Sequence, residues 1–161
     1  MNRNKRVFCI EDTRFIFATN FQGDPQKDRF HSGQRKANII IPDEALAEEM
    51  RDYGINVRQT RPRDENDPDF VPTYYVSALV NYRCPDRFKP RIYIVSGDND
   101  PVLLNEESVG TVDDMWVDKV NVTLSTNEYD DGKFSLYVQT MYIEQRIEDD
   151  PFASRYQRRN G

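Results

Sequence analysis

The sequence contains only two cysteines, Cys9 and Cys84, and a single histidine, His31. Two cysteines without a C-x-x-C motif exclude a disulfide framework and are typical of reduced thiols in a cytoplasmic protein. A lone histidine in a polar, basic segment is a weak candidate for a general base, because such a site needs a partner that fixes the imidazole. The chain also lacks a Walker loop, a dinucleotide-binding glycine pattern and an H-E-x-x-H motif.

Long hydrophobic runs are absent as well. The apolar run 7–10 is too short for a signal peptide, and no stretch is long enough to span a membrane. We therefore expect a cytoplasmic protein with no membrane association. Charged residues make up 31% of the chain, yet nine tyrosines and nine phenylalanines are too many for a disordered protein. Nine prolines and seven glycines punctuate many short segments, which favours one β-rich domain with substantial loops.

The charge is negative overall but unevenly distributed. The net charge of −6 argues against a protein that binds nucleic acid over its whole surface. Residues 1–91 carry 16 Lys and Arg against 14 Asp and Glu, whereas residues 92–161 carry 6 against 14. A local basic groove in the first half is compatible with this distribution, and so is compositional drift without a binding partner.

Two strands are expected between Tyr74 and Val95, because this stretch is rich in β-branched and aromatic residues. Alternation of side chains predicts that Tyr75, Arg83, Arg91 and Tyr93 lie on one outward surface of a paired sheet. Flat rings can stack on bases and cations can bind phosphate, as single-stranded nucleic acid requires. An ordinary half-exposed sheet face also carries Tyr and Arg, and the residues alone leave this alternative open.

The remaining segments predict a mainly β fold with one helix. Strands are expected near 14–18, 37–41, 55–61, 116–124 and 134–147, and a charged loop over 62–72. Asp43 is expected to cap a helix that ends at Gly54, and the short strand-helix-strand link suggests that 37–41 and 55–61 form a parallel pair. Met141 and Ile143 interrupt the alternation of the last strand, which predicts a bulge or a change of burial nearby.

Acidic pairs are the only candidates for a metal site. Asp113-Asp114 and Asp130-Asp131 offer carboxylates that could hold Mg²⁺ in a nuclease, but solvated acidic pairs in loops are far more common. Gly97-Asp-Asn-Asp100 resembles a fragment of a calcium loop without the EF-hand spacing. We therefore expect no metal and no cofactor.

The chain carries an ordered series of short motifs: Asn20-Phe-Gln-Gly, Gly33-Gln-Arg-Lys-Ala-Asn-Ile-Ile-Ile, Ala47-Glu-Glu-Met-Arg-Asp-Tyr-Gly-Ile-Asn-Val-Arg, Pro62-Arg-Asp-Glu, Pro90-Arg-Ile-Tyr-Ile-Val, Glu107-Ser-Val-Gly and Trp116-Val-Asp-Lys-Val-Asn-Val. In this order the motifs resemble a family of bacteriophage single-stranded-DNA-binding proteins with an OB-fold. The resemblance implies an OB-fold-like antiparallel barrel with one helix and long loop insertions. It also implies largely sequence-independent binding of single strands in phage DNA replication, recombination or repair.

On this basis we expect an N-terminal arm over residues 1–13, a single-stranded-DNA-binding domain over 14–147 and a flexible tail over 148–161. The residues expected to contact phosphate are Arg35, Lys36, Arg58, Arg61, Arg83 and Arg91, and those expected to stack on bases are Tyr75, Tyr93 and Tyr137. Phe30 and Phe21 are additional stacking candidates, with packing as the alternative for Phe21.

Partners beyond single-stranded DNA are less defined by the sequence. Asp-Asp-Pro-Phe (149–152) in the tail resembles the partner-recruiting tip of bacterial single-strand binders, so replication or recombination proteins are candidate partners. The tail is equally compatible with a merely solvating terminus, and a homodimer is left open. Two other functions compete with DNA binding: a structural or protein-interaction role in a phage, and a metal-dependent nuclease that uses the acidic loops.

Overall fold

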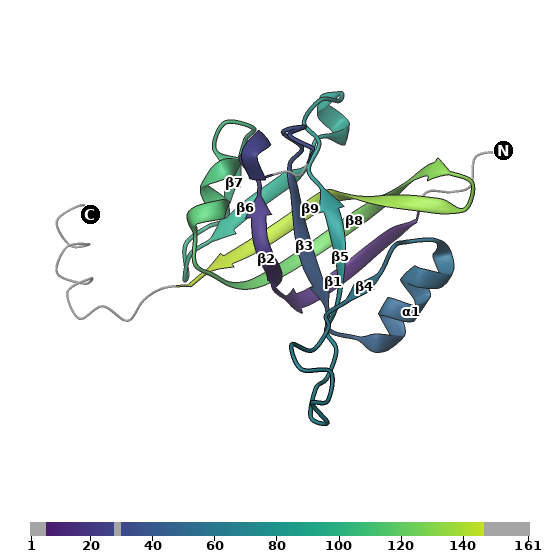
Figure 1. Ribbon diagram of the computed structural model, residues 1–161. Helices are drawn as coiled ribbons and strands as arrows, with labels where there is room; N and C mark the ends of the chain where they lie inside the picture. Colours follow the sequence, from purple (N-terminus) through teal and green to yellow (C-terminus); the bar gives the residue numbers. More distant parts are fainter. Residues whose placement is uncertain (1–5, 28–29, 147–161) are drawn as a thin grey trace, which may run out of the picture.

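The computed structural model describes residues 6–27 and 30–146, and strands dominate it (Figure 1). The strands are β1 (Val7–Thr13), β2 (Phe15–Asn20), β3 (Lys36–Ile41), β4 (Arg58–Gln59), β5 (Tyr74–Leu79), β6 (Arg91–Val95), β7 (Val102–Leu104), β8 (Val117–Asp130) and β9 (Lys133–Gln145). They are joined by the helix α1 (Glu44–Tyr53) and by the 3₁₀ turns η1 (Pro25–Lys27), η2 (Asp86–Phe88) and η3 (Val109–Asp114).

The strands form one strongly bent sheet in the order β1-β8-β9-β5-β3-β2, and β6 joins β9 at its second half. The end strands β1 and β2 are consecutive in sequence and meet at Arg14, whose carbonyl accepts a hydrogen bond from the Ile40 amide at 3.0 Å. This arrangement confirms a mainly β, OB-like fold with one helix. The sheet is not closed into a barrel, and it is not wholly antiparallel, because β5 and β6 both run parallel to β9.

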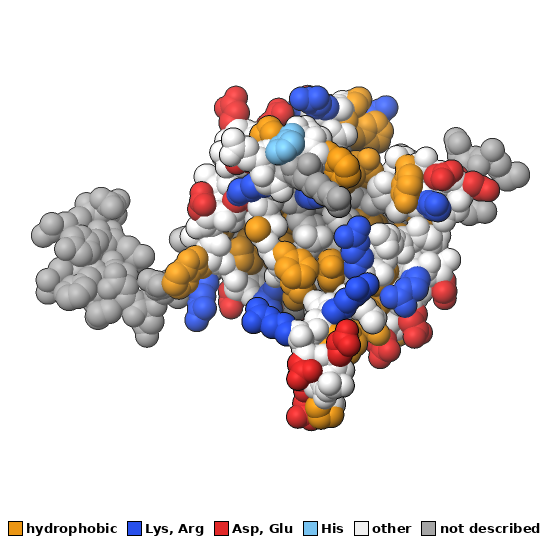
Figure 2. Space-filling view, viewed as in Figure 1, with side chains coloured by type: hydrophobic (Ala, Val, Ile, Leu, Met, Phe, Trp, Pro, Cys, Tyr) orange, Lys and Arg blue, Asp and Glu red, His pale blue; other side chains and the backbone are white. Residues whose placement is uncertain are grey.

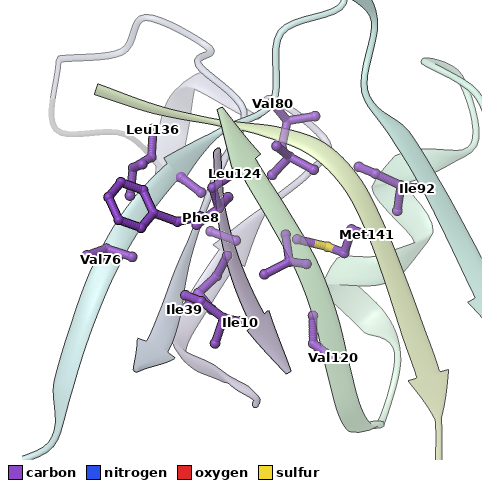
Figure 3. Close-up of a cluster of buried hydrophobic side chains, with 14 of the residues drawn as sticks. Phe8, Ile10, Ile39, Val76, Val80, Ile92, Val120, Leu124, Leu136 and Met141 are labelled. Atoms are coloured by element: carbon purple, nitrogen blue, oxygen red, sulfur yellow. The ribbon is translucent and has the colours of Figure 1, made fainter. Parts of the chain in front are cut away.

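The core fills the concave side of the sheet, where alternate residues of each strand point inward. Phe8, Ile10, Ile39, Val76, Val80, Ile92, Val120, Leu124, Leu136 and Met141 meet there, each at most 4% exposed (Figure 3). Full burial of such a side chain contributes about 1.5–3 kcal/mol. The opposite residues of the same strands are therefore left on the outer face of the sheet, where a binding surface can form.

The prediction of an arm over residues 1–13 is wrong for residues 7–13. They form β1, which pairs with β8 from Val7 to Thr13, and Phe8 and Ile10 are 2% exposed. Strand alternation buries Phe8 and Ile10, and Glu11 and Asp12 face solvent at a shift of register. Residues 1–5 lie outside the described part of the chain, as does the predicted tail 148–161.

The predicted helix is confirmed at both ends. The Asp43 carboxylate accepts a hydrogen bond from the Ala45 amide at 3.0 Å, which satisfies a free donor of the first turn. The chain leaves the helix at Gly54 with φ 120°. The predicted parallel pair after the helix is wrong, because β5 lies between β3 and β4 and pairs antiparallel with both.

The two strands between Tyr74 and Val95 do not pair with each other, in contrast to the prediction. β5 pairs with β9 at Leu136 and Tyr137, and β6 pairs with β9 from Thr140 to Glu144. The segment between them, residues 80–90, therefore leaves the sheet as a loop that carries η2. The register of β8 and β9 shifts between Thr123 and Leu124, which confirms the predicted bulge.

Within the described residues, no helix combines the length and the apolar character that crossing a membrane requires.

Candidate nucleic-acid interface

The outer face of β3 and β5 forms a continuous surface. The pairs Lys36 with Leu79, Asn38 with Ser77 and Ile40 with Tyr75 lie side by side on it, while their strand neighbours are buried except for the half-buried Tyr74. Tyr137 of β9 lies beside Leu79 and extends this surface across the next strand. Figure 2 shows hydrophobic side chains over the middle of this side of the molecule, with Lys and Arg side chains beside them.

One edge of this surface carries an exposed aromatic pair. The ring of Phe17 meets the ring of Tyr75 edge to face, with centroids 5.3 Å apart. Phe17 is 62% exposed and has φ 63°, at a shift of register in β2. A positive φ is costly for a bulky residue, and here it turns the ring outward rather than into the core. Arg58 pairs with Tyr75 from β4 and is exposed, so a cation lies next to the aromatic pair.

A groove of about 610 Å³ lies between loop 80–90 and the β8–β9 ribbon. Its walls carry three cations, Arg87, Lys89 and Arg91, together with the rings of Phe88 and Tyr137. Among the described residues, no Asp or Glu lines it. We call this cavity the basic groove. Because the chain as a whole is acidic, the collection of three cations in one groove creates a local positive field.

The turn η2 presents an aromatic ring to solvent at this groove. Phe88 is 60% exposed, and the guanidinium of Arg87 lies 4.7 Å from its ring centroid. Lys89 forms a salt bridge with Asp86 at 3.0 Å between Nζ and Oδ1. Both side chains of this ion pair are substantially exposed, so the pair is weak and leaves Lys89 available to a phosphate.

A second aromatic pair continues the outer face beyond the groove. Tyr93 of β6 and Tyr142 of β9 stack with centroids 4.7 Å apart and an angle of 10° between their planes. They lie on the same face as Arg91, because Arg91 and Tyr93 alternate with the buried Ile92. The alternation of this strand was therefore predicted correctly, although its pairing partner was not.

The structure divides the predicted site residues into three groups. Arg91 and Tyr137 line the basic groove, Arg83 is exposed in loop 80–90, and Tyr93 follows on the same face. Lys36, Arg58 and Tyr75 lie at the β3–β5 surface, and Arg61 is exposed in the segment after β4. Arg35 and Phe30 lie in the loop between β2 and β3, and Phe30 is 83% exposed. Phe21 is fully buried against Phe15, so it packs in the core instead of offering a stacking surface.

Arg35 is occupied within the protein. Its Nη1 donates hydrogen bonds to the carbonyls of Phe21 at 2.7 Å and Glu106 at 3.1 Å. The same guanidinium lies 5.4 Å from the ring centroid of Tyr82. These contacts join the loop after β2 to the segment after β7. The phosphate contact predicted for Arg35 stays a prediction. The contacts that are observed hold the two loop segments together.

The carboxylate of Asp113 is also used for structure. It is 2% exposed and accepts hydrogen bonds from the amides of Phe21 at 2.8 Å and Gln22 at 2.9 Å, and from the Thr19 hydroxyl at 2.7 Å. Lys27 lies 3.7 Å away. Binding of Mg²⁺ by Asp113 would require these bonds to break. No group of three His, Cys, Asp or Glu residues that could hold a metal occurs in the described ranges.

Several residues of this surface were not singled out by the sequence analysis. They are Phe17, Arg87, Phe88, Lys89 and Tyr142. Arg87-Phe88-Lys89 carried a usable signal, because a ring between two cations, bracketed by Pro85 and Pro90, is typical of an exposed loop that binds phosphate and bases. Phe17 gave no signal, because its strand predicts an ordinary alternation.

Two comparisons with known proteins found matches. A family model described as "Putative phage ssDNA-binding domain" matches residues 1–158. Among solved structures, the chain is similar to gp2.5, a single-stranded DNA binding protein encoded by bacteriophage T7. The two chains are 12% identical, with a TM-score of 0.40, over 96% of this chain and 94% of that chain. No curated protein matches the chain at a significant level.

Proposed function

Because the chain belongs to the family of phage single-stranded-DNA-binding domains, we propose that it binds an unpaired strand across the β3–β5 surface and along the basic groove. In an OB-fold the outer face of the second and third strands binds oligonucleotides. β3 and β5 occupy these positions when β1 and β2 are counted as one bent strand. Membership of the family therefore supports single-stranded DNA as the ligand, and the geometry supports the path of the strand over the surface.

The observation that carries this path is the composition of the basic groove. Three cations and two rings line it without a described acidic side chain, in a chain with a net charge of −6. Cations neutralise phosphates and release counterions, and rings stack on bases of any sequence, at about 1–3 kcal/mol per base. Such a surface binds single strands with little sequence preference.

The length of the surface suits several nucleotides. At about 3.3 Å per residue, β5 spans about 13 Å from Tyr75 to Leu79. Tyr137 lies on the neighbouring strand, and Arg91 lines the same groove as Tyr137. A strand that follows this path meets Phe17 and Tyr75 at one end and the basic groove at the other. We infer a role in protecting or organising single-stranded DNA during phage replication, recombination or repair in the host cell.

The experiment is a titration of a fluorescent thymine oligomer and a duplex of equal length across a salt series. Binding of the single strand that weakens steeply with salt is expected, because phosphate contacts release counterions. Phe88→Ala should lower the affinity about tenfold, because it removes one stacking ring. Tyr129→Ala is the matched control, because Tyr129 is as exposed as Phe88 but lies in the acidic tip of the β8–β9 ribbon.

No binding to the thymine oligomer at low salt would exclude this function for the chain. In that case the same exposed rings would favour the competing interpretation, a surface that binds another phage protein. If Phe88→Ala lowers the affinity for the oligomer no more than the control Tyr129→Ala does, the protein binds DNA but does so away from the basic groove.

A further inference from the structure

A second cavity of about 370 Å³ shares Lys89 and Arg91 with the basic groove. Its other walls come from Tyr82, Asp86, Pro90 and residues 103–107, which include Leu104, Glu106 and Glu107. Any strand whose phosphates contact Lys89 and Arg91 therefore passes the entrance of this cavity. Its volume lies within the range of small-molecule sites. We call it the side cavity.

Tyr82, one of the residues that line the side cavity, carries an unusual polar group. Tyr82 is 8% exposed, and its hydroxyl has no hydrogen-bond partner in the part of the chain that the structure describes. Burial raises the pKa of this phenol, with Arg35 lowering it and Glu106 raising it. The hydroxyl therefore keeps its proton at neutral pH. An unpaired buried hydroxyl costs free energy that a ligand with a complementary polar atom would recover.

The same cavity offers acceptors with negative charge. Glu106 and Glu107 are both exposed and line the cavity. The Glu106 carboxylate lies at 4.0 Å from Arg35, whereas Glu107 has no salt bridge within the described residues. Carboxylates accept hydrogen bonds from amino groups such as N4 of cytosine, and they repel carbonyl oxygens such as O4 of thymine.

From these three features we propose that the side cavity binds one amino-bearing base, cytosine or adenine, of the strand held by the basic groove. The inference rests on the proposed function and adds a subsite to it. Lys89 and Arg91 hold the phosphate at the entrance, and the Tyr82 ring and Leu104 contact the flat base. Glu107 accepts from the exocyclic amino group, and the Tyr82 hydroxyl pairs with a ring nitrogen or carbonyl. Thymine is disfavoured because its O4 would face the carboxylates.

The test compares cytosine and thymine oligomers of equal length at one salt concentration. Cytosine and thymine are both single-ring bases, so a difference in affinity between the two oligomers reports on the identity of the base and not on the size of the stacking ring. We expect the protein to bind the cytosine oligomer about fivefold more tightly. Tyr82→Phe should lower this ratio without loss of stability, because the hydroxyl that it removes has no hydrogen-bond partner among the described residues. Stability is checked by thermal unfolding.

Glu107→Met provides an independent second variant. It removes the acceptor and one negative charge, so the thymine oligomer should bind slightly more tightly while the cytosine preference falls. Glu128→Met is the matched control, because it removes the same charge at the tip of the β8–β9 ribbon, where no residue lines the side cavity. Its cytosine preference should equal that of the unmodified protein.

The outcomes separate this inference from the proposed function. Equal affinity of the unmodified protein for both oligomers would overturn the subsite while single-strand binding stands. No binding to either oligomer would overturn both. Free cytidine monophosphate carries the same chemistry. If it displaces the thymine oligomer better than thymidine monophosphate does, the cavity recognises the base without the rest of the strand; equal displacement together with equal oligomer affinities counts against the subsite.

Discussion

The ring of Phe17 contacts the ring of Tyr75 across an intervening strand. Phe17 belongs to β2 and Tyr75 to β5, and β3 lies between them in the sheet. The reach depends on the local backbone, because φ 63° and the shift of register turn Phe17 out of the ordinary alternation. The exposed aromatic pair therefore depends on a strained backbone at Phe17, and it lies at one end of the proposed strand path.

Replacement of Phe17 by glycine should separate binding from stability. Glycine adopts φ 63° without strain, which offsets the greater backbone freedom of its unfolded chain and the lost ring contact. We expect the free energy of unfolding to change by less than about 1 kcal/mol and the affinity for a thymine oligomer to fall about tenfold. Denaturant unfolding and oligomer titration measure the two quantities. A loss of affinity no greater than that of Tyr129→Gly would remove Phe17 from the interface.

The salt dependence of binding should report on Arg91. If its guanidinium contacts one phosphate, Arg91→Ala reduces the slope of log K against log salt by about 0.7 for a single strand. Arg91 is exposed on β6, so its removal should not change the free energy of unfolding appreciably. Lys133→Ala is the control, because Lys133 lies at the acidic tip beside Asp130. An unchanged slope for Arg91→Ala would mean that the phosphates follow another path.

Local patterns in the sequence predicted the parts of the fold that depend on near neighbours. Alternation correctly placed Tyr75, Arg91 and Tyr93 outward, because period-two burial depends only on the strand itself. The Asp43 cap and the end at Gly54 were predicted for the same reason, since a helix end needs only a few adjacent residues.

The partner of each strand could not be predicted, because it depends on residues far along the chain. β5 and β6 both pair with β9, which follows them by more than thirty residues. Because they pair with different parts of β9, the basic groove lies between them. Arg35 is likewise occupied by carbonyls that are 14 residues away at Phe21 and 71 residues away at Glu106, beyond the reach of a local pattern. The positive φ of Phe17 depends on how β2 meets β3, for which the sequence offers no glycine or proline as a signal.

Asp113 should act in stability and not in DNA cleavage. Asp113→Ala leaves the amides of Phe21 and Gln22 and the Thr19 hydroxyl without their acceptor in a nearly buried site. We expect a loss of about 3–5 kcal/mol in the free energy of unfolding, because three hydrogen bonds to a charged acceptor are lost and each contributes about 1.5–3 kcal/mol at most. Asp114→Ala is the control. Mg²⁺-dependent degradation of an oligomer that Asp113→Ala abolishes, with stability unchanged, would support the nuclease interpretation instead.

Two glycines at positive φ should differ sharply in their tolerance of a side chain. A Cβ at Gly54 would lie 2.3 Å from the carbonyl oxygen of Gly132 and 2.9 Å from the ring of Phe134, whereas a Cβ at Gly132 meets nothing within 4 Å. Gly132→Ala therefore carries only the strain of a left-handed alanine, about 1 kcal/mol. Gly54→Ala adds a clash with the Gly132 backbone, at a place where the Gly54 carbonyl also accepts a hydrogen bond from the Phe134 amide at 3.0 Å.

The end of α1 is thus joined to β9 through a contact that only glycine permits. We expect Gly54→Ala to lower the free energy of unfolding by at least about 2 kcal/mol more than Gly132→Ala, because the backbone itself must move. Denaturant unfolding of both variants at one temperature measures the difference. Equal losses would mean that α1 moves freely against the β8–β9 ribbon. In that case the helix would contribute little to the position of β9, the strand that pairs with both β5 and β6.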